Sequence, residues 1–190
     1  MISFQARYIT SGFVKDSEHN NKCVNFVELE LDSNSDKKTL KKTNRNWIKE
    51  YRKLCKKQNS ETNTDAYLAE SIYRNFKRVR KTPNSKTFYA ITTQNDNFEK
   101  LNHEDILGLT EITTHYVGKY EIENLQAKPN CTASIQNKPY HKIGTSIIDC
   151  LKKALPYKEI QVSPIFDVSE FYEKNGFEYD IETQQVILKA

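Results

Sequence analysis

Two kinds of hydrophobic periodicity alternate along the 190-residue chain, and their order constrains the fold more than any other feature. Apolar residues recur at helical spacing within 36–57, 64–81, 143–155 and 167–175. Alternating, β-branched and aromatic residues, which favour strands, occupy 4–13, 23–31, 86–93, 105–117, 119–128, 159–163 and 177–188. The resulting order, β-β-α-α-β-β-β-α-β-α-β, predicts a mixed α/β fold with four helices.

The chain reads as one domain over residues 1–190, because no repeat or low-complexity linker divides it. A chain of this length buries one sizeable core. No run approaches the roughly 18 apolar residues that a membrane-spanning helix needs. Residues 1–7 lack the basic and apolar regions of an export signal. We therefore expect a cytoplasmic protein with no membrane partner.

The cysteines argue against a disulfide framework and against a zinc site. Cys23, Cys55, Cys131 and Cys150 lie far apart, and none forms a Cys-x-x-Cys pair. Only four scattered histidines are present to complete a metal site. We therefore expect no bound metal.

Positive charge is concentrated in one stretch of the chain. Residues 36–86 contain 16 Lys or Arg against 5 Asp or Glu, a local charge of +11 in a chain whose net charge is +4. The other residues together therefore carry −7. Such asymmetry concerns partners rather than fold. It fits either two solvated helix faces or a surface for a polyanion.

Residues 125–151 carry the main indication of chemistry. A strand is followed there by a loop and then by Gly144-Thr145-Ser146 at the start of an apolar helix. Unpaired N–H groups and the positive end of the helix dipole can hold a pyrophosphate at such a place. The same triplet also fits an ordinary capped helix.

This segment resembles the coenzyme-binding motif of the GNAT superfamily of acyl-CoA-dependent N-acyltransferases. The motif has a splayed strand, a proline soon after it, and Gln/Arg-x-x-Gly-x-Gly/Ala at a helix start. Residues 143–148, Ile-Gly-Thr-Ser-Ile-Ile, match the family's usual Ile-Gly-Thr-Ala-Leu-Leu and make Gly144 the second glycine. We prefer this register because it starts the apolar helix face where the family starts it.

The chain also departs from the family motif. In the preferred register, Pro139 stands at the Gln/Arg position and Lys142 at the first glycine. In the alternative register, His141 replaces Gln/Arg and Ser146 replaces the last small residue. Because this motif contacts pyrophosphate largely through backbone N–H groups, the substitutions weaken the resemblance without removing it.

A second resemblance lies downstream, at residues 168–177, Val-Ser-Glu-Phe-Tyr-Glu-Lys-Asn-Gly-Phe. The superfamily's closing signature reads like Ala-x-x-Phe-Tyr-x-x-x-Gly-Phe at the same distance after the coenzyme helix. By periodicity alone, Phe171, Tyr172 and Phe177 are core aromatics of a short helix. The family's Asn before this helix is absent, since Ile165 occupies its place.

The resemblance implies a fold and a set of site residues. The fold is a central, mostly antiparallel twisted sheet, splayed at the coenzyme site. The implied coenzyme contacts are the main chain of Leu125, Gln126 and Ala127 and, around the pyrophosphate, His141, Lys142, Ile143, Gly144, Thr145 and Ser146. Tyr172 would be the general acid that protonates the departing thiolate.

Attack by an amine also requires a group or a water path that takes up its proton. Glu121 is the first candidate, because it matches the strand position where several histone-modifying members keep a catalytic glutamate. Glu123 is the second, and His115 and Glu111 are further candidates. Each could instead be a solvent-facing residue of a half-buried strand.

The sequence therefore predicts an N-acetyltransferase that uses acetyl-CoA as co-substrate and a small-molecule or protein amine as acceptor, in a ternary complex. One alternative is an amine carried by nucleic acid, such as an aminoacyl-tRNA, because the basic segments 36–57 and 64–81 flank the acceptor cleft in this family. Another is a coenzyme-binding module without turnover, suggested by Pro139, Lys142 and Ile165. Monomer and homodimer both remain open.

Overall fold

The computed structural model describes residues 6–58, 64–79, 86–116, 118–132, 135–155, 159–163 and 169–188. Within them, nine strands form one sheet in the order β6-β1-β2-β3-β4-β5-β7-β9-β8. The strands are β1 (Arg7–Asp16), β2 (Asn21–Leu29), β3 (Lys86–Thr92), β4 (Ile106–Tyr116), β5 (Lys119–Ala127), β6 (Tyr140–His141), β7 (Glu159–Val162), β8 (Glu178–Asp180) and β9 (Gln185–Leu188). All neighbouring strands are antiparallel except β5 and β7, which are parallel. The predicted mixed, mostly antiparallel sheet is confirmed.

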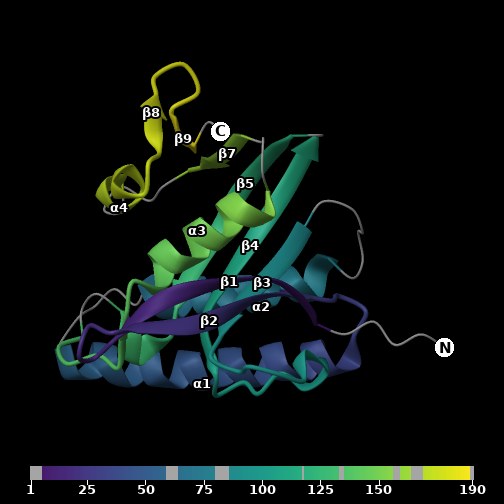
Figure 1. Cartoon of the computed structure of the whole chain (residues 1–190), viewed down its shortest axis with the longest axis vertical. Coiled ribbons are helices and arrows are strands. Elements are labelled where there is room, and N and C mark those ends of the chain that lie inside the picture. The colour runs from purple at the N-terminus through teal and green to yellow at the C-terminus, as the bar shows by residue number, and fades with distance from the viewer. Residues whose placement is uncertain are drawn as a thin grey trace.

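Four α-helices flank the sheet in the described part of the chain (Figure 1). They are α1 (Asn34–Gln58), α2 (Thr64–Val79), α3 (Ile143–Ala154) and α4 (Ser169–Lys174). Two short 3-10 turns, η1 (Phe98–Lys100) and η2 (Pro129–Cys131), lie in the loops. In Figure 1, α1 runs along the lower edge of the molecule and α3 crosses in front of β4 and β5. The four predicted helices are confirmed, and residues 80–81 of the second lie outside the described residues.

The sheet separates two hydrophobic cores. Along β3, Phe88 and Ala90 belong to one core, whereas Tyr89 and Ile91 belong to the other. This alternation follows from the two-residue repeat of a strand whose two faces are both covered. One core takes in the apolar residues of α1 and α2, among them Leu40, Trp47, Tyr51, Ile72 and Phe76. The other takes in α3 and α4, with Ile143, Ile147, Leu151 and Tyr172.

Some elements differ from the sequence-based expectation. The short strand β6 pairs with the end of β1 and was not predicted, since two residues carry no periodicity. The closing segment, which was expected to form one strand or a pair, forms the pair β8 and β9. The start of the first predicted strand, residues 4–5, lies outside the described residues.

Among the described residues, no helix is long and apolar enough to cross a membrane. No group of three or more His, Cys, Asp or Glu side chains in the same part of the chain is placed to hold a metal ion.

Helix α1 begins earlier than the sequence predicted. The hydrophobic spacing predicted a helix from residue 36, but the helix starts at Asn34, and the Asp36 N–H donates to Ser33 Oγ at 3.1 Å. The hydroxyl of Ser33 therefore caps this end. The buried Asp36 carboxylate instead accepts a hydrogen bond from the Glu30 N–H at 3.0 Å, which ties β2 to the helix.

We expect the buried Asp36 carboxyl to make stability depend on pH. Burial raises the pKa of Asp36 to about 6, against an ordinary value of 3.8, although the hydrogen bond from Glu30 opposes the shift. The folded state therefore holds this proton more tightly than the unfolded state, and stability falls as pH rises from about 4 to 6. Relative to Asp36→Asn, the free energy of unfolding of the wild type should fall by up to about 3 kcal/mol over this window. Urea denaturation of both proteins at pH 4, 5, 6 and 7 measures the difference, and a constant difference would contradict the assignment.

Candidate active site

The sheet opens between β5 and β7. The two strands pair in parallel from Lys119–Glu159 to Ile122–Val162 and no further. Within the described residues, 123–127 of β5 therefore have a strand neighbour only on the β4 side. The β4–β5 register shifts at this point, where Glu111 and Ile112 pair with Asn124 and Ile122. A bulge of this kind bends the strand and increases its twist. The predicted opening in the sheet is present here.

Helix α3 starts without a side-chain cap. Its N-cap residue, Lys142, has φ 60° and ψ 25°, and no side-chain hydrogen bond closes the end of the helix. The first intrahelical bond runs from Ser146 N–H to Lys142 C=O at 2.9 Å. The N–H groups of Ile143, Gly144 and Thr145 therefore precede the first helical hydrogen bond, as the earliest donors of any helix do. Together with the helix dipole, they form a place suited to an anion.

The left-handed backbone at Lys142 bears on one departure from the family motif. Glycine adopts this conformation with little strain, whereas other residues adopt it rarely. Lys142 stands where the motif has its first glycine, and its φ of 60° is one that glycine adopts readily.

Gly144 brings three elements together. A Cβ atom at this position would lie 2.8 Å from Phe171 Cζ on α4 and 3.5 Å from Leu125 Cδ2 on β5. The first turn of α3 thus touches both α4 and the unpaired end of β5. Only glycine leaves room for this approach without displacing the Phe171 ring.

Tyr172 is a buried side chain of α4. Its ring makes edge contacts with Phe171 and Phe177, at centroid distances of 5.0 and 5.3 Å. Burial raises the pKa of Tyr172 to about 12, so the phenol stays protonated at neutral pH. The residue belongs to the same core as Ile143, and Leu125 packs against that core. Both interpretations from sequence, core aromatic and proton donor, fit this position.

Glu121 and His115 form a pair at the closed end of the β5–β7 opening. Glu121 Oε2 lies 2.7 Å from His115 Nε2. Its other oxygen accepts a longer hydrogen bond, 3.4 Å, from Ser163 Oγ just after β7. The Glu121 side chain is 18% exposed and the His115 side chain 38%. Solvent and a ligand therefore reach the imidazole more readily than the carboxylate.

Glu123 and Glu111 belong to a second polar group, centred on Lys86. Glu111 is fully buried, and its carboxylate accepts hydrogen bonds from Lys86 Nζ at 2.6 Å, Asn75 Nδ2 at 2.9 Å and Asn124 Nδ2 at 2.7 Å. Glu123 accepts a hydrogen bond from Thr113 Oγ1 at 2.7 Å and lies 3.5 Å from Lys86 Nζ. Although partial burial opposes it, the two carboxylates raise the pKa of Lys86. Glu111 thus joins α2 to β3, β4 and β5, and its full set of donors suits a structural role.

Two residues of the predicted coenzyme set lie against β1 or the turn that follows it. Ser146 is buried and lies where a Cβ on Gly12 of β1 would come within 2.8 Å of its Oγ. His141 pairs with Lys15 of β1, and its ring lies 5.1 Å from that of His19. By contrast, Gly144 lies against Leu125 at the open end of β5, and Ile143 lies against Gly108 of β4.

Tyr51 of α1 is a site-supporting residue that sequence reasoning missed. Its hydroxyl donates to the Ala127 C=O, and Gln126 Nε2 donates to that hydroxyl at 2.6 Å. The hydroxyl therefore ties the open end of β5 to α1. In the sequence, Tyr51 was one apolar residue of a helical stripe, and nothing local indicated a polar role.

No family model matches the chain, and no curated protein matches it. Solved structures do. They include Campylobacter jejuni N-acetyltransferase PseH in complex with acetyl coenzyme A, at 20% identity and TM-score 0.41 over 63% of this chain and 78% of that one. A Bacillus subtilis acetyltransferase in complex with CoA matches at 17% identity and TM-score 0.37, over 60% of this chain and 83% of that one. An acetyltransferase of the GNAT family from Staphylococcus aureus Mu50 matches at 17% identity and TM-score 0.40, over 82% of this chain and 83% of that one.

These matches are likenesses to acetyltransferases, at TM-scores below 0.5 that support no inference about activity.

Proposed function

We propose that the chain is an N-acetyltransferase that takes an acetyl group from acetyl-CoA and transfers it to a primary amine. The observation that carries the proposal is the uncapped first turn of α3 beside the unpaired end of β5. The first turn of α3 offers N–H donors and the positive end of a helix dipole to a phosphate group. The unpaired end of β5 offers main-chain hydrogen-bonding groups to an extended chain that carries amides. An acyl-CoA has both kinds of group.

The chain's own residues divide the binding task. The N–H groups of Ile143, Gly144 and Thr145 would hold the pyrophosphate. Main-chain groups of Leu125, which point away from β4, would pair with the pantetheine arm, whereas those of Gln126 are directed to Leu109 of β4. The Ala127 C=O is already bonded to Tyr51, so its role is to fix the strand end. Ser146 has a structural role, because its N–H bonds to Lys142 within α3 and its buried side chain packs on β1.

The coenzyme supplies the acetyl group as a thioester, and on transfer a new N–C bond replaces the C–S bond while one proton leaves the amine and one reaches sulfur. We assign uptake of the amine proton to Glu121 acting with His115, which are 2.7 Å apart. An imidazole that is within hydrogen-bond distance of a carboxylate can act as a general base. We assign delivery of a proton to sulfur to Tyr172. Burial raises the pKa of its phenol and so keeps it protonated. Glu123 is a second candidate base that shares its carboxylate with Lys86 and Thr113.

The acceptor we favour is an amine of a small molecule or a protein. A coenzyme-binding module without turnover is the competing proposal, because Pro139 and Lys142 depart from the family motif. At Lys142 the φ of 60° is one that glycine adopts readily, so this departure does not argue against coenzyme binding in either proposal. Formation of free CoA from acetyl-CoA, measured with a panel of amines, distinguishes the two proposals. The module would bind acetyl-CoA but would form no free CoA with any amine.

Replacing Gly144 by Val should weaken CoA binding at least tenfold, equivalent to about 1.4 kcal/mol. The new side chain would push Phe171 away from α3 and disturb the junction of α3, α4 and β5. Isothermal titration calorimetry with CoA measures the change. Asp149→Ala, on the exposed face of the same helix, is the control that should leave affinity unaltered. Equal affinity for the wild type and Gly144→Val would remove the assignment of the site, provided both proteins bind CoA.

A further inference from the structure

The outer face of α1 carries an uninterrupted set of cations. All exposed residues of this helix whose side chains are described, apart from Asn34 and Asn46, are Lys or Arg. We call these eight residues the basic stripe: Lys38, Lys41, Lys42, Arg45, Lys49, Arg52, Lys53 and Lys56. With 3.6 residues per turn, their spacing places all of them within about a third of the helix circumference. The stripe therefore forms one continuous surface.

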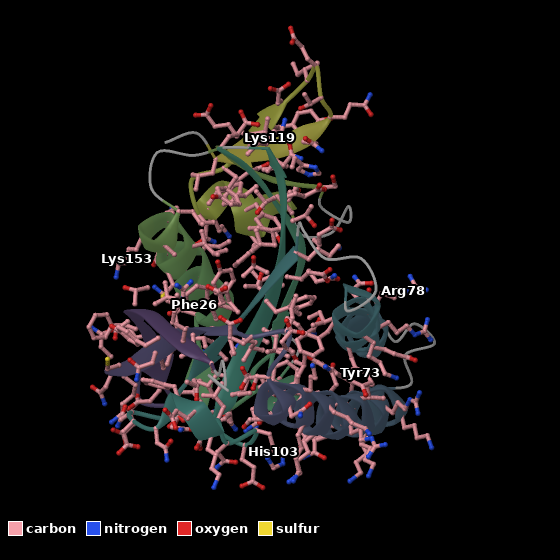
Figure 2. All side chains as sticks on the ribbon, turned by 90° about the vertical axis from the view of Figure 1, so that its right-hand side faces the viewer. Phe26, Tyr73, Arg78, His103, Lys119 and Lys153 are labelled. Atoms are coloured by element: carbon pink, nitrogen blue, oxygen red, sulfur yellow. The ribbon has the colours of Figure 1, made fainter. Side chains whose placement is uncertain are left out.

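The cations of the basic stripe have no acidic ion-pair partner in the part of the chain that the structure describes. None of them takes part in the ion pairs found among the described residues. The basic residues of α2 differ, because Arg74 pairs with Glu70 at 2.7 Å and Lys77 lies 5.0 Å from the centre of the Tyr73 ring. In Figure 2, α1 lies along the base of the molecule with its side chains directed outward, and Tyr73 and Arg78 of α2 lie above it. Of the two basic helices, α1 is therefore the stronger candidate for binding a polyanion.

The charge density of the stripe matches a nucleic-acid backbone. From Lys38 to Lys56 the helix rises about 27 Å, at 1.5 Å per residue. Eight cations over this length give about one charge per 3.4 Å, which is the axial spacing of phosphates along one strand of a duplex. The other parts of the chain, which carry −7 outside residues 36–86, would repel a polyanion and leave α1 as the favoured approach.

The apolar side of α1 argues against a lipid surface as the partner. A helix that binds membranes buries an apolar face among the acyl chains. In α1 that face, with Leu40, Trp47 and Tyr51, is already buried in the protein core. The large exposed hydrophobic residues of the described chain are Tyr8, Phe13, Tyr179 and Ile181, and none belongs to α1. Because none of these exposed aromatic residues lies on α1, binding at the stripe would not involve stacking on nucleic-acid bases.

From these observations we infer that the basic stripe of α1 binds the phosphate backbone of double-helical nucleic acid, without reading its sequence. Binding would rest on Lys and Arg contacts to phosphates and on the release of counterions. The inference is independent of acetyl transfer, since the stripe lies on the helix face opposite the core and none of its residues belongs to the proposed coenzyme site. Loss of either property would leave the other in place.

Fluorescence anisotropy with two labelled probes, a 20-base-pair DNA duplex of mixed sequence and folded tRNA, tests the inference at several KCl concentrations. We expect the wild type to bind at least one probe with a Kd of about 10 µM or tighter at 50 mM KCl, and to weaken steeply with salt. The test variant replaces Arg45, Lys49, Arg52 and Lys56, the middle of the stripe, with Gln. It should bind at least tenfold more weakly, and its salt slope should fall by about 0.9 for each lost phosphate contact.

A matched variant distinguishes an effect of the basic stripe itself from an effect of the protein's net charge. Replacing Lys22, Lys100, Lys153 and Lys174 with Gln removes the same charge from elsewhere on the surface. It should weaken binding less than threefold. Equal losses in the two variants would overturn the inference, as would no binding of either probe by 100 µM wild-type protein at 50 mM KCl. Tighter binding to vesicles of phosphatidylserine and phosphatidylcholine than to both nucleic acids would also overturn it.

Discussion

Tyr172→Phe should lower turnover by about 10²-fold or more, in line with the contribution of a general acid, while changing the affinity for CoA little. The substitution removes one hydroxyl and keeps the ring between Phe171 and Phe177, so packing in α4 is preserved. A proton donor acts mainly on the transition state, and its loss therefore appears in kcat rather than in binding. The measurement is release of free thiol from acetyl-CoA with the best amine found in the acceptor panel.

Tyr179→Phe is the matched control for this variant. Tyr179 also lies in the C-terminal part of the chain, but its side chain is exposed. It should retain wild-type turnover. If Tyr172→Phe also keeps its turnover within a factor of two, Tyr172 is a core aromatic and water protonates the thiolate.

Glu111→Ala should lower the free energy of unfolding by about 2–3 kcal/mol, a change of roughly a hundredfold in the folding equilibrium. The variant leaves Lys86 without its nearest carboxylate and removes the acceptor of both Asn75 and Asn124. Donors left unpaired in a buried place carry the full cost of their desolvation. Glu123, 3.5 Å from Lys86 Nζ, keeps the loss below that of a fully isolated charge. Urea denaturation measures the effect.

The same substitution at Glu104, which is exposed, supplies the control and should change stability by less than about 0.5 kcal/mol. A similarly small effect at position 111 would mean that the three hydrogen bonds to its carboxylate contribute no net stability. Glu111→Gln should fall between the two variants, because it keeps the size of the side chain and one acceptor oxygen.

The sequence allowed the order of helices and strands to be predicted, because each element has one or two buried faces that set its periodicity. The stripe through Leu40, Trp47 and Tyr51 and the alternation along β3 are local patterns. Residues 143–148 and 168–177 located the helix starts and the short helix α4 in the same way. Strand β6 escaped prediction because its two residues pair with β1 through contacts far away in the sequence.

The polar contacts of the candidate site could not be predicted from local pattern. Tyr51 and Ala127, or Asn75 and Glu111, meet only after helices and strands have packed together. Neither spacing nor composition indicates such pairs, and a resemblance to a family indicates positions rather than partners. The orientation of Ser146 toward β1 is a further example, since a helix start alone does not reveal which side chain faces the sheet.

Amide hydrogen exchange with and without CoA tests the proposed coenzyme site most directly. With saturating CoA, exchange should slow at least tenfold at the amides of residues 143–145 and at those of 123–126 that do not pair with β4. Exchange in β2 and in residues 38–46 of α1 should be unaltered, because these segments contact neither α3 nor the open end of β5 in the contacts described above. CoA that protects other segments, or that leaves the first turn of α3 and the free edge of β5 unprotected, would contradict the account.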